Sequence, residues 1–238
     1  MSELQAATDL REWSPPRTTS LPALDLVRLL GVLVAPGIVI ASLLGFLLGW
    51  AAAVIGLVAY SGFVWLWLST QGRRALRSSR AAPVERAEAP RLFNLAHGMA
   101  DDLGIARPGV WLAPEDEPNA MVCRGGGPLL VVSRGLLDTY TRTELEAVVA
   151  HCLVRLDHKE LRRAALGAAM GRLAGRMGGS DLVAVDARAA ALTRYPVGLA
   201  SAISKATTKS GLGAAFWFVP QGGGWQSQNE RAARLNDL

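Results

Sequence analysis

An uncharged stretch of forty residues, 29–68, constrains this 238-residue chain more than any other feature. One membrane-spanning helix needs roughly 20 apolar residues, so the stretch is long enough for two spans. We place these spans at about 26–44 and 48–68, with Gly45 and Gly49 available for a tight reversal between them. The alternative is a buried hairpin of a soluble protein, but uncharged runs of this length are rare in soluble cores.

A cluster of basic residues follows the second span and predicts its orientation: Arg73, Arg74, Arg77 and Arg80. Cytoplasmic flanks of membrane helices carry an excess of Lys and Arg. We therefore expect a multi-pass protein of the cell (inner) membrane, with its N-terminus and its C-terminal domain in the cytoplasm. The net charge is +5, and its concentration beside the membrane favours membrane lipid as a partner. The sequence carries no nucleic-acid motif.

The apolar patterning divides the chain into four parts. They are a flexible arm (1–23), a transmembrane hairpin (24–70), a basic juxtamembrane connector (71–89) and a cytoplasmic domain (90–238). The last part contains helical periodicity from residue 90, strand-like runs at 110–112, 119–123 and 129–133, and helical runs at about 144–156, 160–176, 181–192 and 231–235. The predicted fold class is α+β, mostly helical, with a small β-hairpin or sheet beside the membrane hairpin.

The helix at 144–156 carries the residues that bear on chemistry. Thr141 or Thr143 is expected to cap it, and Thr143 with Glu146 has the spacing of a capping box. In the zincin pattern H-E-x-x-H, two histidines four residues apart bind Zn²⁺ and the glutamate acts as general base. Here His151 is present, but Cys152 takes the place of the glutamate and Arg155 that of the second histidine.

These replacements predict a degenerate motif. A thiol is mostly protonated near neutral pH, and a guanidinium has no lone pair to give to a metal. Cys152 is also poorly aimed at His151, because neighbours on a helix diverge by about 100°, so we expect a packed core thiol and no nucleophile. Cys123 and Cys152 are both expected to be free thiols.

Several segments resemble, in order, the HtpX-like membrane zinc metallopeptidases, a gluzincin family. The similar segments are 89–93, 117–120, 133–138, 144–151, 196–203 and 230–235. The resemblance implies a zincin-like peptidase domain over about 90–238. It also implies that the third zinc ligand, a glutamate four residues before Asp186, falls on Leu182, with Asp181 adjacent but turned away. The family's late histidine aligns near Trp225, so His151 is the one retained ligand position.

Two further hypotheses concern binding. Arg155 can replace the charge of the missing metal by pairing with Asp181 or Asp186, the alternative being a solvated surface arginine.

The other hypothesis concerns Pro118, Asn119 and Ala120, which match the family's cleft-lining edge strand. Such a strand can hold an extended peptide by main-chain hydrogen bonds. The alternative is a short protected edge.

The sequence predicts a catalytically inactive, membrane-anchored metallopeptidase homologue without a cofactor. We expect it to act as a binding, regulatory or scaffold subunit for a protein partner or membrane complex. One alternative is an active zinc-dependent membrane endopeptidase of protein quality control with atypical ligands. Another is a structural accessory subunit whose spans contact a larger complex.

Overall fold

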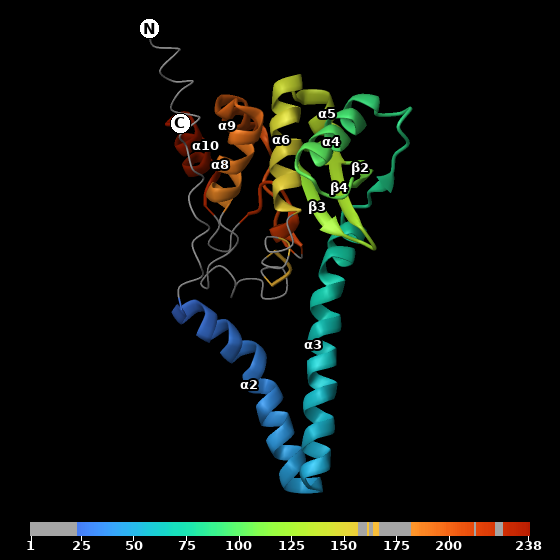
Figure 1. Ribbon diagram of the computed structural model, residues 1–238, viewed down its shortest axis with the longest axis vertical. Coiled ribbons are helices and arrows are strands. Elements are labelled where there is room, and N and C mark those ends of the chain that lie inside the picture. The colour runs from blue at the N-terminus through green and yellow to red at the C-terminus, as the bar shows by residue number, and fades with distance from the viewer. Residues whose placement is uncertain (1–22, 157–160, 162–163, 167–181, 212, 222–225) are drawn as a thin grey trace.

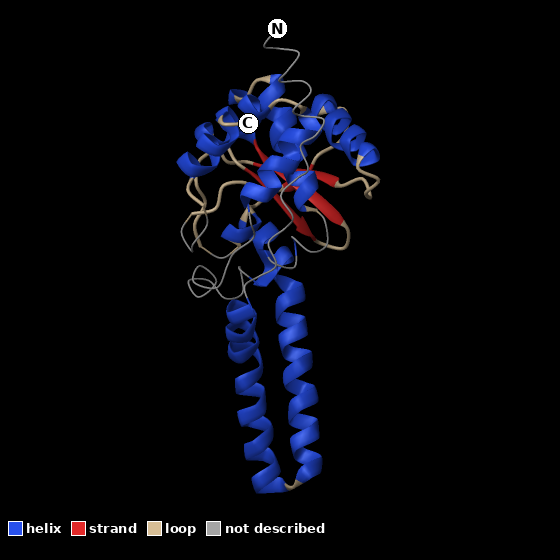
Figure 2. Cartoon of the chain, turned by 60° about the vertical axis from the view of Figure 1, so that its left-hand side comes forward, coloured by secondary structure: helices blue, strands red, loops and turns tan. Residues whose placement is uncertain are grey.

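Two long helices form a stalk that carries a globular domain in the computed structural model (Figures 1 and 2). The structure describes residues 23–156, 161, 164–166, 182–211, 213–221 and 226–238. Helix α2 (Ala23–Leu48) and helix α3 (Trp50–Ser78) run antiparallel. Gly49 joins them at φ 92°, a left-handed conformation that favours glycine, and its N–H donates to the carbonyl of Gly45 at 3.0 Å.

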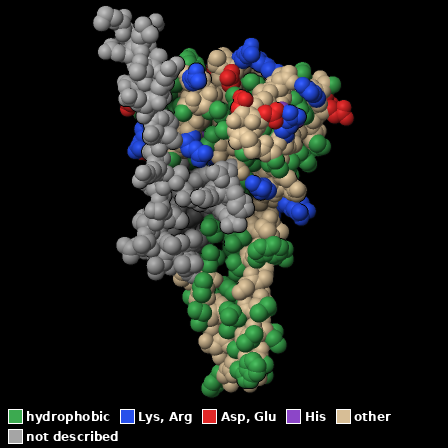
Figure 3. Space-filling model, in the orientation of Figure 1, with side chains coloured by type: hydrophobic (Ala, Val, Ile, Leu, Met, Phe, Trp, Pro, Cys, Tyr) green, Lys and Arg blue, Asp and Glu red, His purple; other side chains and the backbone are tan. Residues whose placement is uncertain are grey.

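Both stalk helices are long and apolar enough to cross a membrane. Large apolar side chains such as Phe46 and Trp50 are 88% and 82% exposed, and Figure 3 shows hydrophobic side chains spread over the stalk. Exposed apolar surface of this extent indicates contact with membrane or protein. Helix α3 runs ten residues further than the predicted span, so residues 71–78 of the expected connector are helical.

A four-stranded sheet of order β1-β2-β4-β3 forms one side of the domain. The strands are β1 (Ala82–Pro83), β2 (Gly109–Ala113), β3 (Ala120–Arg124) and β4 (Pro128–Ser133). β3 and β4 form the predicted antiparallel hairpin, β2 and β4 are parallel, and β1 adds antiparallel to β2. The sheet therefore leaves β3 on its outer edge.

Helices cover the sheet and surround a central helix, α6 (Arg142–Arg155). The others are α4 (Pro90–Asp102), α5 (Arg134–Thr139), α8 (Leu182–Thr193), α9 (Pro196–Lys205), the 3₁₀ turn η2 (Ala214–Phe216) and α10 (Gln228–Asn236). Because α6 packs against α4, α8, α9 and β3, nearly every residue from 144 to 155 is buried. The predicted fold class is confirmed: mostly helical, with a small mixed sheet.

Thr141 caps helix α6. Its Oγ1 accepts from the N–H of Glu144 at 3.4 Å, and the Glu144 carboxylate accepts from the N–H of Thr141 at 2.9 Å. The preferred capping box of Thr143 with Glu146 was therefore wrong. Thr141 and Glu144 have the same spacing two residues earlier, immediately after α5 ends at an extended Tyr140.

Candidate functional site

A buried cluster of charged and polar side chains lies where α6, α8 and α10 meet. His151 of α6 has no exposed surface, and its Nδ1 lies 2.7 Å from Oδ1 of Asp186 on α8. Arg231 of α10 donates from Nε to Oδ2 of Asp186 at 2.6 Å and from Nη2 to Oδ1 at 2.8 Å. The Asp186 carboxylate thus orients the imidazole and forms a bidentate ion pair with the guanidinium.

The surroundings of His151 hold it neutral. Burial lowers its pKa to about 4, although the contact with Asp186 acts in the opposite direction. Burial also opposes ionisation of Asp186, but Arg231 outweighs it and keeps the pKa of that carboxyl below its usual value. Nδ1 lies close to Asp186 but outside hydrogen-bond geometry, and the buried Nε2 has no hydrogen-bond partner among the described residues. A carboxylate orients a metal-binding histidine in this way.

Arg155, one turn after His151, lies inside the protein and is 1% exposed. Its Nη2 donates to the carbonyl of Ala215 at 2.5 Å, and its Nη1 donates to those of Phe216 at 3.4 Å and Trp217 at 2.7 Å. A permanent cation in an apolar interior needs such partners, because an unpaired buried charge is strongly destabilising. The alternative of a solvated surface arginine was therefore wrong.

Two acidic residues, Asp181 and Asp186, were predicted as partners of Arg155, and the structure describes one of them. Asp181 lies outside the described residues, so that pairing stays a prediction. Asp186 is instead engaged by Arg231 and His151. This role of Arg231 was not predicted, although the position of Asp186 within an alanine-rich helix was a signal that a cation must reach its carboxylate.

Cys152 and Leu182 occupy the general-base and third-ligand positions as packed side chains. Cys152 is 1% exposed, and burial raises the pKa of its thiol to about 12. Leu182 is fully buried in the first turn of α8. Neither side chain supplies a base or a metal ligand at neutral pH. Trp225 lies outside the described residues, and the aromatic ring packed edge-on against His151 is that of Phe218, with centroids 4.8 Å apart.

The predicted peptide-binding edge at Pro118, Asn119 and Ala120 is covered by a later part of the same chain. We call this part the edge segment (residues 207–211 and 213–220). Its Phe218 N–H donates to the carbonyl of Ala120 at 2.7 Å, and its Thr207 N–H donates to that of Pro118 at 2.8 Å.

Asn119 fastens the edge segment further. Its Nδ2 donates to the carbonyls of Thr207 at 2.6 Å and Val219 at 3.3 Å. Its side-chain oxygen accepts from the N–H of Val219 at 3.4 Å. An added peptide would therefore have to displace the edge segment before it could pair with β3 at this position.

Comparison with known proteins gives the same family from two directions. The profile of Peptidase family M48 matches residues 86–211. A "Protease HtpX homolog" of Thermococcus sibiricus is 31% identical over 145 residues, which cover 60% of this chain and 47% of the relative. Another, of Persephonella marina, is 29% identical over 148 residues, covering 61% and 50%. The chain thus spans about half the length of the curated relatives it matches. No solved structure matches it significantly.

Zinc is the metal to which the family points, because M48 peptidases of the HtpX type are zinc metalloproteases. The expectation of no cofactor is corrected accordingly. Nε2 of His151 is buried without a hydrogen-bond partner among the described residues, so it is available as one ligand. However, within the described part of the chain no group of three or more His, Cys, Asp or Glu side chains could hold a metal ion. Since a catalytic zinc site uses three protein ligands, the described residues do not fit the metal, and we assign no chemical step to it.

The matched region covers just over half of the chain and contains the central helix, strands β2 to β4 and the buried His151–Asp186 contact. The resemblance to the HtpX-like family that the sequence indicated is therefore confirmed at the level of the family. This chain belongs to peptidase family M48, among its HtpX-like membrane metallopeptidases.

Proposed function

We propose that this chain is a membrane-anchored M48 homologue that does not hydrolyse peptides. In this proposal it acts as a binding, regulatory or scaffold subunit for a protein partner or membrane complex. The carrying observation is the position of Arg155, whose buried guanidinium donates to three consecutive carbonyls of residues 215–217. The interior therefore contains a fixed cation at the position where the zincin pattern places a metal ligand.

Three features support the loss of hydrolysis independently of Arg155. Peptide hydrolysis by zincins requires a carboxylate general base, and Cys152 is a buried thiol with a raised pKa. The position expected to supply a third ligand is the buried Leu182. The edge segment occupies the strand edge along which an extended substrate would pair, with Phe218 bonded to Ala120.

The test compares the full chain with its His151→Ala variant, both purified in detergent, on a fluorescent casein substrate with and without added Zn²⁺. Equal rates for the two proteins are expected. Hydrolysis by the natural chain that requires Zn²⁺ and disappears in the His151→Ala variant would overturn the proposal.

A restored variant carrying Cys152→Glu, Arg155→His and Leu182→Glu completes this test. It is expected to raise the amount of zinc bound per chain, measured by elemental mass spectrometry. Because Leu182→Glu places a carboxylate in the core, melting temperatures accompany the measurement. Arg155→His alone serves as a second, milder variant.

The subunit role is tested in native membranes. Blue-native electrophoresis after mild detergent extraction is expected to place the chain in an assembly larger than the chain with its micelle. Migration as the isolated chain at every detergent concentration would contradict this role. The alternative is an active zinc-dependent membrane endopeptidase of protein quality control with atypical ligands, and zinc-dependent casein hydrolysis would support its peptidase activity.

We also propose the orientation in the membrane. The exposed arginines that follow the apolar part of α3, Arg73, Arg74 and Arg77, support a cytoplasmic globular domain. The N-terminus would then lie on the same side. Single-cysteine labelling of intact cells with a membrane-impermeant maleimide at the loop around Gly49 tests this orientation, and labelling of the domain instead of the loop would reverse it.

A further inference from the structure

We propose that a pocket between the C-terminal half of α3 and the globular domain binds one anionic membrane lipid. Its acyl chain would lie along α3 and its phosphate at Arg124. The proposal is independent of the catalytic status of the His151 cluster. It requires that α2 and α3 lie in a membrane.

The pocket has the size and lining of an acyl-chain site. Its volume of about 610 Å³ lies within the range of roughly 300–1,000 Å³ typical of ligand sites. Helix α3 lines it with Trp65, Leu68, Ser69 and Gly72, and η2 lines it with Phe216. The four α3 positions recur at intervals of three and four residues, which places them on one face of the helix. Apolar surface therefore predominates in the pocket.

The location of the pocket matches the polar boundary of a bilayer. The predicted second span ends at Leu68, and the exposed Arg73 and Arg74 follow within two turns. Trp65, which is 71% exposed, has the amphipathic ring that favours the interface. Figure 3 shows Lys and Arg side chains where the stalk meets the domain. Clustered basic residues at this level attract anionic lipid.

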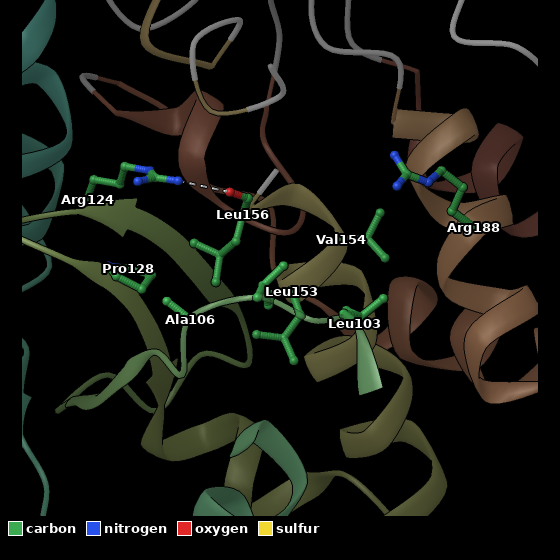
Figure 4. A pocket seen from close by; sticks show the side chains of 9 residues that line it. Leu103, Ala106, Arg124, Pro128, Leu153, Val154, Leu156 and Arg188 are labelled. Carbon is green, nitrogen blue, oxygen red and sulfur yellow. Dashed lines mark hydrogen bonds between the residues drawn. The ribbon is translucent and has the colours of Figure 1, made fainter. Parts of the chain in front are cut away.

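Arg124 supplies the charge for a headgroup. It is the charged residue among the described residues of the pocket, and it is exposed at the end of β3. Figure 4 shows its side chain extended toward Leu156 at the end of α6, where Nη2 donates to the carbonyl at 3.4 Å. A guanidinium has five N–H donors, so further donors remain for a phosphate, whose geometry it matches.

Gly72 fixes Arg124 relative to the membrane helix. A Cβ at Gly72 would lie 3.0 Å from the carbonyl oxygen of Arg124, so the backbones of α3 and β3 are in direct contact. The apolar wall and the cation are thereby held at a set distance. A cation beside an apolar pocket favours an anionic lipid over a zwitterionic lipid, because a zwitterionic headgroup carries no net charge to pair with Arg124.

The test is native mass spectrometry of the full chain titrated with phosphatidylglycerol or phosphatidylcholine of identical acyl chains. The natural chain is expected to retain one phosphatidylglycerol molecule in preference to phosphatidylcholine. Arg124→Gln should lower this retention by about fivefold, the effect of one basic residue on anionic lipid binding, and leave phosphatidylcholine unchanged. Leu68→Trp, which fills the pocket, should lower retention of both lipids.

Two matched variants serve as controls. Arg74→Gln removes an arginine of α3 that does not line the pocket, and Leu66→Trp adds the same bulk at an exposed position of α3. Both should retain lipid as the natural chain does. Equal losses in Arg74→Gln and Arg124→Gln would show diffuse attraction and overturn the site. Unchanged retention in Leu68→Trp, or a protein segment found in place of the lipid, would also overturn it.

Discussion

Arg231 and Asp186 form a two-point ion pair inside the protein, although 45 residues separate them in the sequence. The two hydrogen bonds measure 2.6 and 2.8 Å, and the residues are 1% and 2% exposed. Nη1 of Arg231 also donates to the carbonyl of Phe218 at 3.0 Å. This pair therefore joins α8, α10 and the edge segment around the ring of His151.

Removing Arg231 should be severely destabilising. Arg231→Met leaves the Asp186 carboxylate buried without its cation, which costs about 3–5 kcal/mol in comparable buried pairs. The free energy of unfolding by urea measures this. Arg234→Met is the matched control, because its bond to Glu230 is exposed and worth under about 1 kcal/mol. Equal losses of unfolding free energy in the two variants would contradict the structural role of the Arg231–Asp186 pair.

Arg155→Met tests the carbonyl contacts of the central helix. The substitution keeps a long apolar side chain but leaves the carbonyls of residues 215–217 without their donor. Unsatisfied buried groups cost about 1–3 kcal/mol each, so a loss of at least about 2 kcal/mol is expected in urea unfolding. Arg142→Met, at the exposed start of α6, should change stability by less than about 0.5 kcal/mol. An unchanged free energy of unfolding in Arg155→Met would mean that the guanidinium does not hold the edge segment.

Asn119→Asp tests the attachment of the edge segment to β3. A carboxylate cannot donate to the carbonyls of Thr207 and Val219, so the segment should open more often. Hydrogen exchange followed by mass spectrometry should show faster exchange of the amides of Thr207 and Phe218. Asn94→Asp, at an exposed position bonded to Arg86, should leave this exchange unchanged. Unchanged exchange in Asn119→Asp would show that other contacts hold the segment.

Glu144 should make stability depend on pH under acidic conditions. Burial acts to raise its pKa, but its bonds to Lys205, Ser201 and Thr141 prevail and lower the value to about 2. A carboxyl with a depressed pKa contributes stability above its unfolded pKa of about 4.3, and this is lost as pH falls through the folded value.

Glu144→Gln keeps the spacing of the capping box but removes the ion pair with Lys205, whose Nζ lies 2.7 Å from the carboxylate. The natural chain should therefore be the more stable at pH 6, and the difference should shrink between about pH 4.3 and pH 2. Circular dichroism melts over this range measure it. A difference that is constant with pH would exclude the ionised carboxylate as its source.

The two thiols should be unreactive in the folded protein. Cys123 and Cys152 are both free and buried, and burial raises the pKa of each to about 12. Maleimide labelling at pH 7 is expected to modify both thiols in guanidinium chloride and to be at least about a hundredfold slower in the native state, since the thiolate is the nucleophile. Rapid native labelling of Cys152, with Cys123→Ser as the background, would contradict its place in the core.

The strands and helices that depend on the pattern of neighbouring residues were predictable from the sequence. The short apolar runs of β3 and β4, the turn between them and the apolar length of the stalk helices all follow from neighbours in the chain. The end of α3 was not predictable in this way. Residues 69–78 are mostly polar and basic, yet they continue the helix, and Gly72 and Ala75 pack against β3 and Gly213.

The candidate site was predictable at its positions but not in its contacts. The spacing around His151 identified the replaced positions, since that pattern is local to one helix. Among the described residues, the hydrogen-bond partners of Arg155 are main-chain carbonyls of η2 and the residue after it, 60–62 residues away, and carbonyls carry no signal in side-chain patterns. The pairing of Asp186 with Arg231 likewise depends on two helices meeting in space.

The contact of Ala75 with Gly213 connects the stalk helix α3 to the segment that binds the buried Arg155. A Cβ at Gly213 would lie 2.7 Å from that of Ala75, so helix α3 is in close contact with the residue that precedes η2. The next residues of the chain carry the carbonyls that hold Arg155. A change in the tilt of α3 would therefore displace Gly213 and, with it, the residues whose carbonyls accept from the buried guanidinium of Arg155.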